Sequence, residues 1–263
     1  FPDEYSVLEQ IQQRGVLRAG YVHGRLPFTF FNEHAELVGF DVEILNQLAS
    51  EMGVGLEFVP LTWDTLFEQV NSDEVDIVGT VPLTTQVLMN LELSDPYLDG
   101  ALSLVVRDHR RTEFSHREKL LLNRELTIAY PGPAGYIRPS IESAIPSISI
   151  TWKEIKNLRE FFEQEDEIFD ALIIEAEIVA ACTLLYPEYT VVTPASSKLN
   201  IPLGFAVPAV QHQFAVSLGR WIADKKATGD IQIAYDYWIL GKGAEKREPR
   251  WSIKKDVLGW GEQ

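Results

Sequence analysis

Cysteine is almost absent from this 263-residue chain, in which Cys182 stands alone. A single cysteine excludes an internal disulfide and any cysteine-rich zinc site. The five histidines lack the close spacing of metal ligands, and the sequence therefore predicts neither a metal site nor a cofactor. The chain also has no Gly-x-Ser-x-Gly motif and no phosphate-binding loop, so these signatures of catalysis and phosphate binding are missing.

Basic residues are scarce relative to acidic ones: 23 Lys and Arg face 39 Asp and Glu, which gives a net charge of −16. A surface this acidic repels phosphate backbones, so we expect no nucleic-acid partner. Apolar runs fall far short of the roughly 18–20 residues that a membrane-spanning helix needs. The first residue is Phe1 and no signal peptide follows, a pattern typical of a mature product or an excised domain.

Hydrophobic residues make up 46% of the chain, which is ordinary for a packed globular protein, and the length suggests about two compact domains. The first part reads as strands at 16–22, 56–59 and 75–79, a hairpin over 26–40, and helices at 42–52 and 62–70. Asp41 is the expected N-cap of the helix that follows it. Because strands alternate with helices, we expect a largely parallel sheet.

The second part of the chain repeats this order. Strands are expected at 126–130, 148–152, 171–174 and 189–192, with helices at 157–164 and 177–185. The last third holds a strand at 203–207 and an amphipathic helix that starts near Phe214. The predicted fold class is therefore α/β, with two units in tandem.

Several short motifs occur in an order that resembles a known family over residues 7–240. They are Val16-Leu17-Arg18-Ala19-Gly20, Leu37-Val38-Gly39-Phe40-Asp41-Val42-Glu43, Val75-Asp76-Ile77-Val78, Leu93-Ser94-Asp95-Pro96-Tyr97, Leu104-Val105-Val106 and Asp170-Ala171-Leu172-Ile173-Ile174-Glu175. Each motif is weak alone, but the ordered set resembles the type II periplasmic solute-binding proteins of the polar amino-acid class, family 3.

The resemblance implies two lobes, each a mostly parallel sheet flanked by helices, joined by two hinge strands. Lobe 1 would comprise residues 1–99 and 198–263, the latter including a C-terminal tail, and lobe 2 would comprise residues 100–197. The implied function is a non-catalytic receptor, monomeric as an isolated domain, on the periplasmic or extracellular face of a membrane. It would capture a small polar metabolite, an amino acid or a related amine or carboxylate, and deliver it to a membrane transporter.

The family also implies an arginine after the third strand that pairs with the ligand carboxylate, but this position is Val87 here. Burial of a carboxylate without a cation costs several kcal/mol. Either the ligand differs from a standard α-amino acid, or Arg25 or Arg138 supplies the missing charge. The alternative is that both arginines are solvated surface residues.

Glu175 is the strongest single candidate, because a carboxylate directly after a buried strand is costly to bury unless it meets a cation, such as a ligand amine, or hydrogen-bond donors. The alternative is an exposed strand end or a structural salt bridge. Aromatic walls are expected from Phe28, Trp63 and Tyr136, whose alternative is burial in the core. The remaining candidates follow strands of the two lobes and are Gly79, Thr80, Val81 and Gly135.

The tail from Gly241 is basic and contains Trp251 and Trp260. It looks similar to solute-binding domains fused to cation:dicarboxylate symporters, and its alternative is a segment that packs on lobe 1. Two other functions stay open: a ligand-sensing domain of a signalling receptor, and a dehydratase-like enzyme with Glu175 as general acid. The sequence supplies no partner acid or base for Glu175, so we expect no enzyme.

Overall fold

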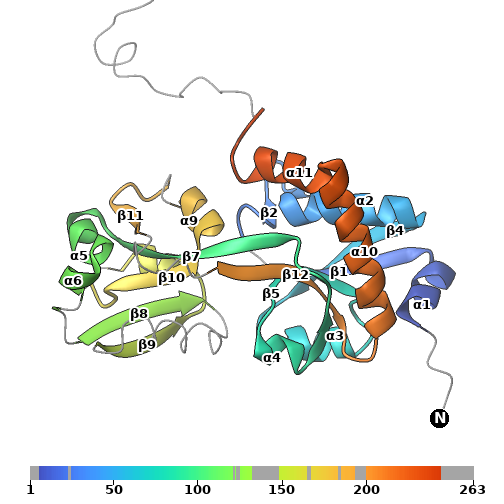
Figure 1. Ribbon diagram of the computed structural model, residues 1–263, viewed down its shortest axis with the longest axis horizontal. Helices are drawn as coiled ribbons and strands as arrows, with labels where there is room; N and C mark the ends of the chain where they lie inside the picture. Colours follow the sequence, from blue (N-terminus) through green and yellow to red (C-terminus); the bar gives the residue numbers. More distant parts are fainter. Residues whose placement is uncertain are drawn as a thin grey trace, which may run out of the picture.

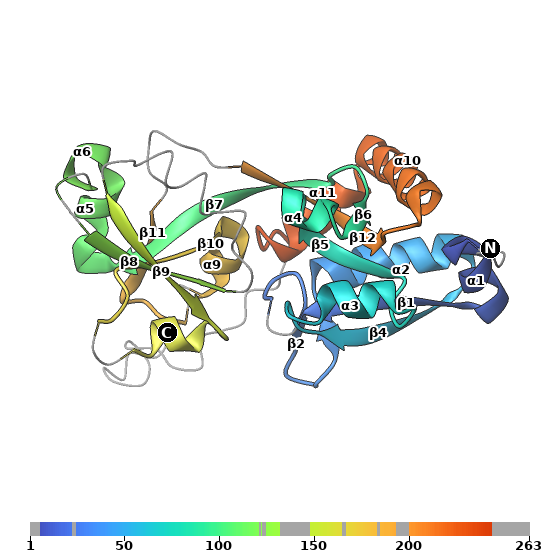
Figure 2. The same cartoon turned by 90° about the horizontal axis from the view of Figure 1, so that it is seen from below.

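The computed structural model describes residues 6–22, 25–120, 122, 125–131, 148–164, 167–182, 185–192 and 200–243. Two bodies of sheet and helix lie along the long axis, joined by β7 (Leu98–Arg107) and β12 (Asn200–Pro208) (Figures 1 and 2). This mixed α/β architecture with two lobes confirms the predicted fold class. We call the body that carries β1 the first lobe and the body that carries β8 the second lobe; the residue bounds given above for them stay a prediction.

The first lobe is built on three parallel strands, ordered β4-β1-β5, with β12 antiparallel beside β5. Helices cover both faces of this sheet, with α2 and α11 above it and α3 and α4 below it in Figure 1. β2 and β3 form the predicted antiparallel hairpin, and β6 pairs with β12. The bounds are α1 (Val7–Arg14), β1 (Val16–Val22), β2 (Phe30–Phe31), β3 (Leu37–Val38), α2 (Phe40–Met52), β4 (Gly55–Leu61), α3 (Leu66–Asn71), β5 (Ile77–Pro82), α4 (Thr85–Leu88), β6 (Leu91–Leu93), α10 (His212–Thr228) and α11 (Asp230–Trp238).

The second lobe repeats this arrangement. Its parallel strands are ordered β9-β8-β10, and β7 lies antiparallel beside β10, as β12 does beside β5. β11 pairs with the other edge of β7. The bounds are α5 (Arg111–Ser115), α6 (Arg117–Leu120), β8 (Glu125–Pro131), β9 (Ser149–Ile155), α8 (Arg159–Phe162), β10 (Ala171–Glu175), α9 (Ala176–Cys182) and β11 (Tyr189–Val192).

One side-chain device recurs in both lobes, and we call it the aspartate clamp. Asp76 immediately precedes β5 and accepts a hydrogen bond from the Arg18 backbone N–H on β1 at 2.8 Å. Asp170 immediately precedes β10 and accepts one from the Thr127 N–H on β8 at 2.6 Å. Arginine side chains, Arg14 and Arg18 in one lobe and Arg110 in the other, bind the same carboxylates. Each clamp fixes the register between two neighbouring parallel strands, β1 and β5 in the first lobe and β8 and β10 in the second.

β7 changes partner in mid-strand. Its residues up to Ala101 pair with β12 of the first lobe, and its residues from Leu102 onward pair with β10 of the second. The two lobes therefore share one continuous strand, and the exchange of partners falls between them. The family resemblance implies crossings between the lobes near residues 98–102 and 193–198, and the second of these segments lies outside the described residues.

The start of α2 differs from the prediction. Gly39, not Asp41, is the N-cap residue, and Asp41 lies inside the first turn with only 4% of its surface exposed. Gly39 has φ 132°, and a Cβ at this position would lie 2.3 Å from the Phe28 carbonyl oxygen. The close approach of the hairpin requires glycine here, and this moves the helix start ahead of Asp41.

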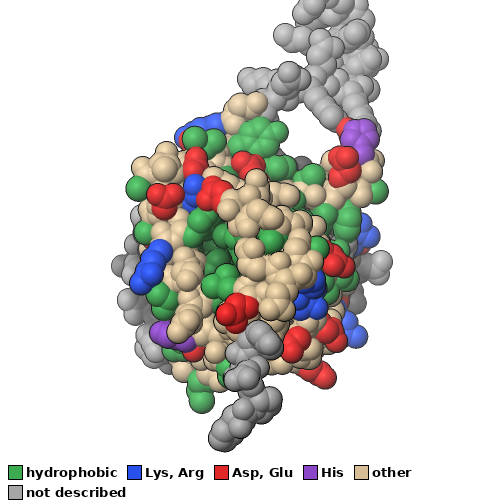
Figure 3. Space-filling view, turned by 90° about the vertical axis from the view of Figure 1, so that its right-hand side faces the viewer, with side chains coloured by type: hydrophobic (Ala, Val, Ile, Leu, Met, Phe, Trp, Pro, Cys, Tyr) green, Lys and Arg blue, Asp and Glu red, His purple; other side chains and the backbone are tan. Residues whose placement is uncertain are grey.

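The surface of the first lobe carries charges of both signs. Figure 3 shows the end of the molecule at the right of Figure 1, where acidic and basic side chains are interspersed among apolar ones. Among the described residues, no helix has the length and apolar character needed to cross a membrane.

Candidate ligand-binding site

A cavity of about 600 Å³ lies between the two lobes. Its walls come from residues at or just beyond the carboxyl ends of the parallel strands, the usual position of a ligand site in α/β folds. The first lobe contributes Val22, Arg25, Trp63, Leu66, Phe67, Pro82, Gln86 and Val87, and the second contributes Pro131, Lys156, Asn157, Leu158, Arg159, Ile174, Glu175 and Ile178.

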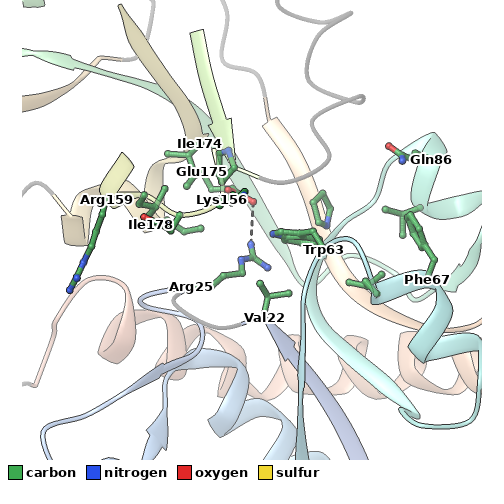
Figure 4. A pocket seen from close by; sticks show the side chains of 16 residues that line it. Val22, Arg25, Trp63, Phe67, Gln86, Lys156, Arg159, Ile174, Glu175 and Ile178 are labelled. Atoms are coloured by element: carbon green, nitrogen blue, oxygen red, sulfur yellow. Dashed lines mark hydrogen bonds and ion pairs between the residues drawn. The ribbon is translucent and has the colours of Figure 1, made fainter. Parts of the chain in front are cut away.

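A buried ion pair crosses the cavity (Figure 4). The Arg25 Nη2 lies 3.2 Å from the Glu175 Oε1, and the two residues are only 8% and 7% exposed. Arg25 follows β1 of the first lobe and Glu175 ends β10 of the second, so this pair connects the lobes directly. The Arg25 Nη1 also donates a 2.7 Å hydrogen bond to the Thr80 carbonyl oxygen.

Two aromatic rings face the Arg25 guanidinium. Its Cζ lies 5.4 Å from the centre of the Phe28 ring and 5.3 Å from that of the Trp63 ring, within the range of cation–π attraction. Trp63 lines the cavity, whereas Phe28 is fully buried in the core. The backbone of Arg25 is also held, because its carbonyl oxygen accepts hydrogen bonds from the Phe28 and Thr29 N–H groups.

A polar network lies behind Arg25. The Thr80 hydroxyl donates to the Asp41 carboxylate, and the Tyr97 hydroxyl contacts both groups. Burial raises the pKa of Asp41 to about 6, although the hydrogen bond from Thr80 and the charge of Arg25 oppose this rise. Burial, together with the nearby Asp41, also holds the pKa of Tyr97 well above its usual range.

Gly79 and Thr80 adapt the backbone to this network. A Cβ on Gly79 would lie 2.9 Å from the Asp41 Cγ, so glycine leaves room for the carboxylate. Thr80 has φ 44°, a left-handed conformation that costs a non-glycine residue about 1–3 kcal/mol. The hydrogen bonds of its hydroxyl and backbone hold this conformation, in which the Thr80 carbonyl oxygen accepts from Arg25.

Away from the ion pair the walls are mostly apolar. Val87, which stands at the expected arginine position, lines the cavity from α4 and is 7% exposed. Among the described residues that line the first-lobe wall, Arg25 is therefore the buried cation. Lys156 and Arg159 lie at the exposed rim, and Arg159 extends away from the Arg25–Glu175 pair (Figure 4).

The structure brings several predicted residues together. Arg25, Trp63 and Glu175 line the cavity, and Thr80 reaches Arg25 through its carbonyl group. Phe28 and Val81 are fully buried and are not among the described lining residues. Gly135, Tyr136 and Arg138 lie outside the described residues. The assignment of all ten predicted residues to ligand binding stays a prediction.

Sequence reasoning missed Phe67, Gln86, Lys156 and Asn157. A usable signal existed for the last two, because they directly follow β9, and residues after parallel strands gather at one edge of a sheet. Phe67 and Gln86 lie on helices, where periodicity alone does not tell a cavity wall from a core face.

A second contact between the lobes lies close to the cavity. The Tyr235 hydroxyl on α11 is 3.5 Å from the Glu177 Oε1 on α9, while the buried Glu177 Oε2 has no hydrogen-bond partner. Burial is the main cause that raises the pKa of Glu177, and the charge of Glu175 adds to it. Among the residues that the structure describes, no group of three or more His, Cys, Asp or Glu is placed to hold a metal ion.

A two-lobed α/β fold with a cavity between its lobes is the architecture of the periplasmic solute-binding proteins. The chain belongs to the bacterial extracellular solute-binding proteins, family 3, whose sequence pattern matches residues 17–241.

Individual relatives differ in the share of the chain that they match. The L-cystine-binding protein TcyJ of Escherichia coli K12 is 31% identical over 114 residues, 43% of this chain and 42% of that protein, so the match spans about two fifths of that relative. Cyclohexadienyl dehydratase of Pseudomonas aeruginosa is 22% identical over 89% of this chain and 86% of its own. The crystal structure of the ancestral amino acid-binding protein AncCDT-1, a precursor of cyclohexadienyl dehydratase, superposes with a TM-score of 0.74 at 26% identity, over 89% of this chain and all of that one.

Proposed function

We propose that this protein is a non-catalytic receptor that captures a small polar metabolite, an amino acid or a related amine or carboxylate, between its lobes. The observation that carries this proposal is the buried Arg25–Glu175 pair in a cavity with walls from both lobes. A zwitterionic solute offers a carboxylate to Arg25 and an ammonium group to Glu175, and so replaces one ion pair by two. Two relatives are L-cystine-binding proteins, so amino acids are the first solutes to test.

The proposal includes the setting of this receptor. Family members are named as extracellular, and we place this chain on the periplasmic or extracellular face of the membrane, where it passes solute to a transporter. A symporter fused to its C-terminus remains one candidate for that transporter. The lobes take the bounds expected from the sequence, 1–99 with 198–263 and 100–197. Their relative motion about the crossing strands would close the cavity over the solute.

A thermal-shift screen over amino acids, amines and dicarboxylates tests the function. A bound solute raises Tm by mass action, and mass spectrometry of the recovered solute checks that it is unchanged. Glu175→Ala should abolish binding of any solute that carries an ammonium group, with Glu188→Ala, an exposed glutamate between α9 and β11, as control. Full affinity of Glu175→Ala would remove Glu175 from the site.

Two other outcomes would change the assignment. Chemical turnover of a stabilising solute would show that the protein is an enzyme and not a receptor. Dehydration is the first reaction to test, because one relative is a cyclohexadienyl dehydratase. A signalling receptor would bind solute in the same way, so the neighbouring domains of the full-length gene product decide between signalling and transport.

A further inference from the structure

The groups that surround the Arg25 guanidinium are all suited to a cation. They are the Glu175 carboxylate, the Thr80 carbonyl oxygen and the faces of Phe28 and Trp63. We call these four groups the cation cage. Carboxylates, carbonyl oxygens and aromatic faces are also the groups with which proteins bind free organic cations.

The chain itself fills this cage. Arg25 is 8% exposed, and its backbone is tied into a turn by the Phe28 and Thr29 N–H groups. A free guanidinium or ammonium compound that enters the cavity must therefore displace a tethered cation, which is present at high effective concentration. Such a compound would also leave Arg25 without its carboxylate partner, and a buried unpaired charge is costly.

We propose that Arg25 acts as a built-in occupant of the cation cage and so sets the specificity of the cavity: it excludes organic cations that lack a carboxylate and selects carboxylate-bearing solutes with an apolar body. This inference rests on the proposed function in that it takes the cavity as the solute site, and it narrows the proposed solutes to those that carry a carboxylate, so simple amines drop out. The apolar walls at Leu66, Phe67 and Val87 accommodate the body of such a solute. One guanidinium N–H of Arg25 is engaged by Thr80 and another by Glu175. The remaining N–H donors are available to the carboxylate of the solute.

The test is to empty the cage and supply a free cation. Arg25→Ala is titrated with methylguanidinium chloride by calorimetry and thermal shift, against sodium chloride at equal ionic strength. We expect the variant to bind one methylguanidinium at least tenfold more tightly than the wild-type protein does, with a rise of a few degrees in Tm at saturation. Adding Glu175→Gln to the variant should weaken that binding about tenfold, because the carboxylate is lost.

Arg110→Ala is the matched control. The Arg110 guanidinium also lies over an aromatic ring, at 5.1 Å from the centre of Phe114, and binds the carboxylates of Glu113 and Asp170, but it lies outside the cavity. Its side chain is 23% exposed, so removal should leave no buried cage for methylguanidinium. An equal response in Arg110→Ala or in the wild-type protein would overturn the proposal.

The remaining outcomes are also decisive. A folded Arg25→Ala, as judged by circular dichroism, that does not bind methylguanidinium overturns the proposal. If Arg25→Ala does not fold, Arg25→Ser takes its place, and refolding of either variant only in the presence of methylguanidinium supports the cage. If no solute binds the wild-type protein while Arg25→Ala still binds methylguanidinium, the proposed function fails and the cage stands.

Discussion

Asp41 shows how a single buried residue supports the site without touching it. Its carboxylate holds the Thr80 hydroxyl, and the Thr80 carbonyl oxygen accepts from Arg25. Thr80 adopts φ 44° in this arrangement, so the strain of its backbone is balanced by the network around it. The orientation of Arg25 in the cavity thus depends on a residue of α2 that lies one layer behind.

Asp41→Asn tests this residue through pH. The pKa of Asp41 is raised from 3.8 to about 6, so the folded protein holds this proton more tightly than the unfolded chain does. The contribution of Asp41 to stability is therefore full below about pH 4 and is lost as pH rises through about 6. The free energy of unfolding of the wild-type protein should fall by about 2 kcal/mol relative to Asp41→Asn between pH 4 and pH 7.

Urea unfolding of both proteins at each pH gives this difference, and the other titrating groups cancel between them. A constant difference across the range would show that folding does not raise the pKa of Asp41.

Local sequence patterns identified some of these residues and not others, for physical reasons. Glu175 is a candidate because it follows an apolar strand, and Arg25 because the position at which the family implies an arginine is Val87. Asp41 was assigned a capping role from its neighbours in sequence, whereas its partners Thr80 and Tyr97 are 39 and 56 residues away. No local periodicity encodes such a contact, and the same holds for the 150-residue separation of Arg25 and Glu175.

The aspartate clamps show that the two lobes use one design at the level of strands. Asp76, just before β5, binds the backbone of β1, and Asp170, just before β10, binds the backbone of β8. The environments differ, because the Asp76 side chain is 2% exposed and that of Asp170 is 29% exposed. The same hydrogen bond should therefore contribute more in the first lobe.

Alanine substitutions measure this difference. Asp76→Ala leaves the Arg18 N–H without its acceptor and should lower the free energy of unfolding by about 3 kcal/mol, whereas Asp170→Ala should cost about 1–2 kcal/mol. Asp76→Asn keeps an acceptor for the Arg18 N–H and should recover part of the loss. Equal losses for Asp76→Ala and Asp170→Ala in urea unfolding would contradict this ranking.

The strands were predictable where short apolar segments are bounded by turn residues. β1 and β8, the fully buried β10 and the hairpin of β2 and β3 lie where these segments placed them. α3 begins at Leu66 rather than at Thr62, because Thr62 and Thr65 exchange side-chain and backbone hydrogen bonds in a turn. A turn and a first helical turn differ here by only a few hydrogen bonds. The residue types alone therefore do not determine where the helix begins.

At the scale of the whole molecule, the described residues include two polar side-chain contacts between the lobes: Arg25 with Glu175 across the cavity, and Tyr235 with Glu177 close to it. Both involve the junction of β10 and α9 on the second lobe. The crossing strands β7 and β12 connect the lobes covalently, and we expect these two contacts to limit how far the lobes separate.

Loss of both contacts should open the molecule. We expect Glu175→Gln combined with Tyr235→Phe to increase the radius of gyration of the solute-free protein in small-angle scattering. Glu163→Gln combined with Tyr186→Phe, which removes a hydrogen-bonded pair within the second lobe, is the matched control and should leave it unchanged. An unchanged radius in the first double variant would show that the crossing strands alone set the separation of the lobes.

The path of the chain through β7 and β12 has a mechanical consequence. The chain leaves the first lobe along β7, builds the second lobe, and returns along β12 to α10 and α11 (Figure 1). A pulling force applied between Ser6 and Gly243 is therefore carried first by the first lobe, and the second lobe bears load only after β12 has separated from β5, β6 and β7. In a pulling experiment the first lobe should unfold before the second. The second lobe should stay folded until then and add its chain length in a later, separate step.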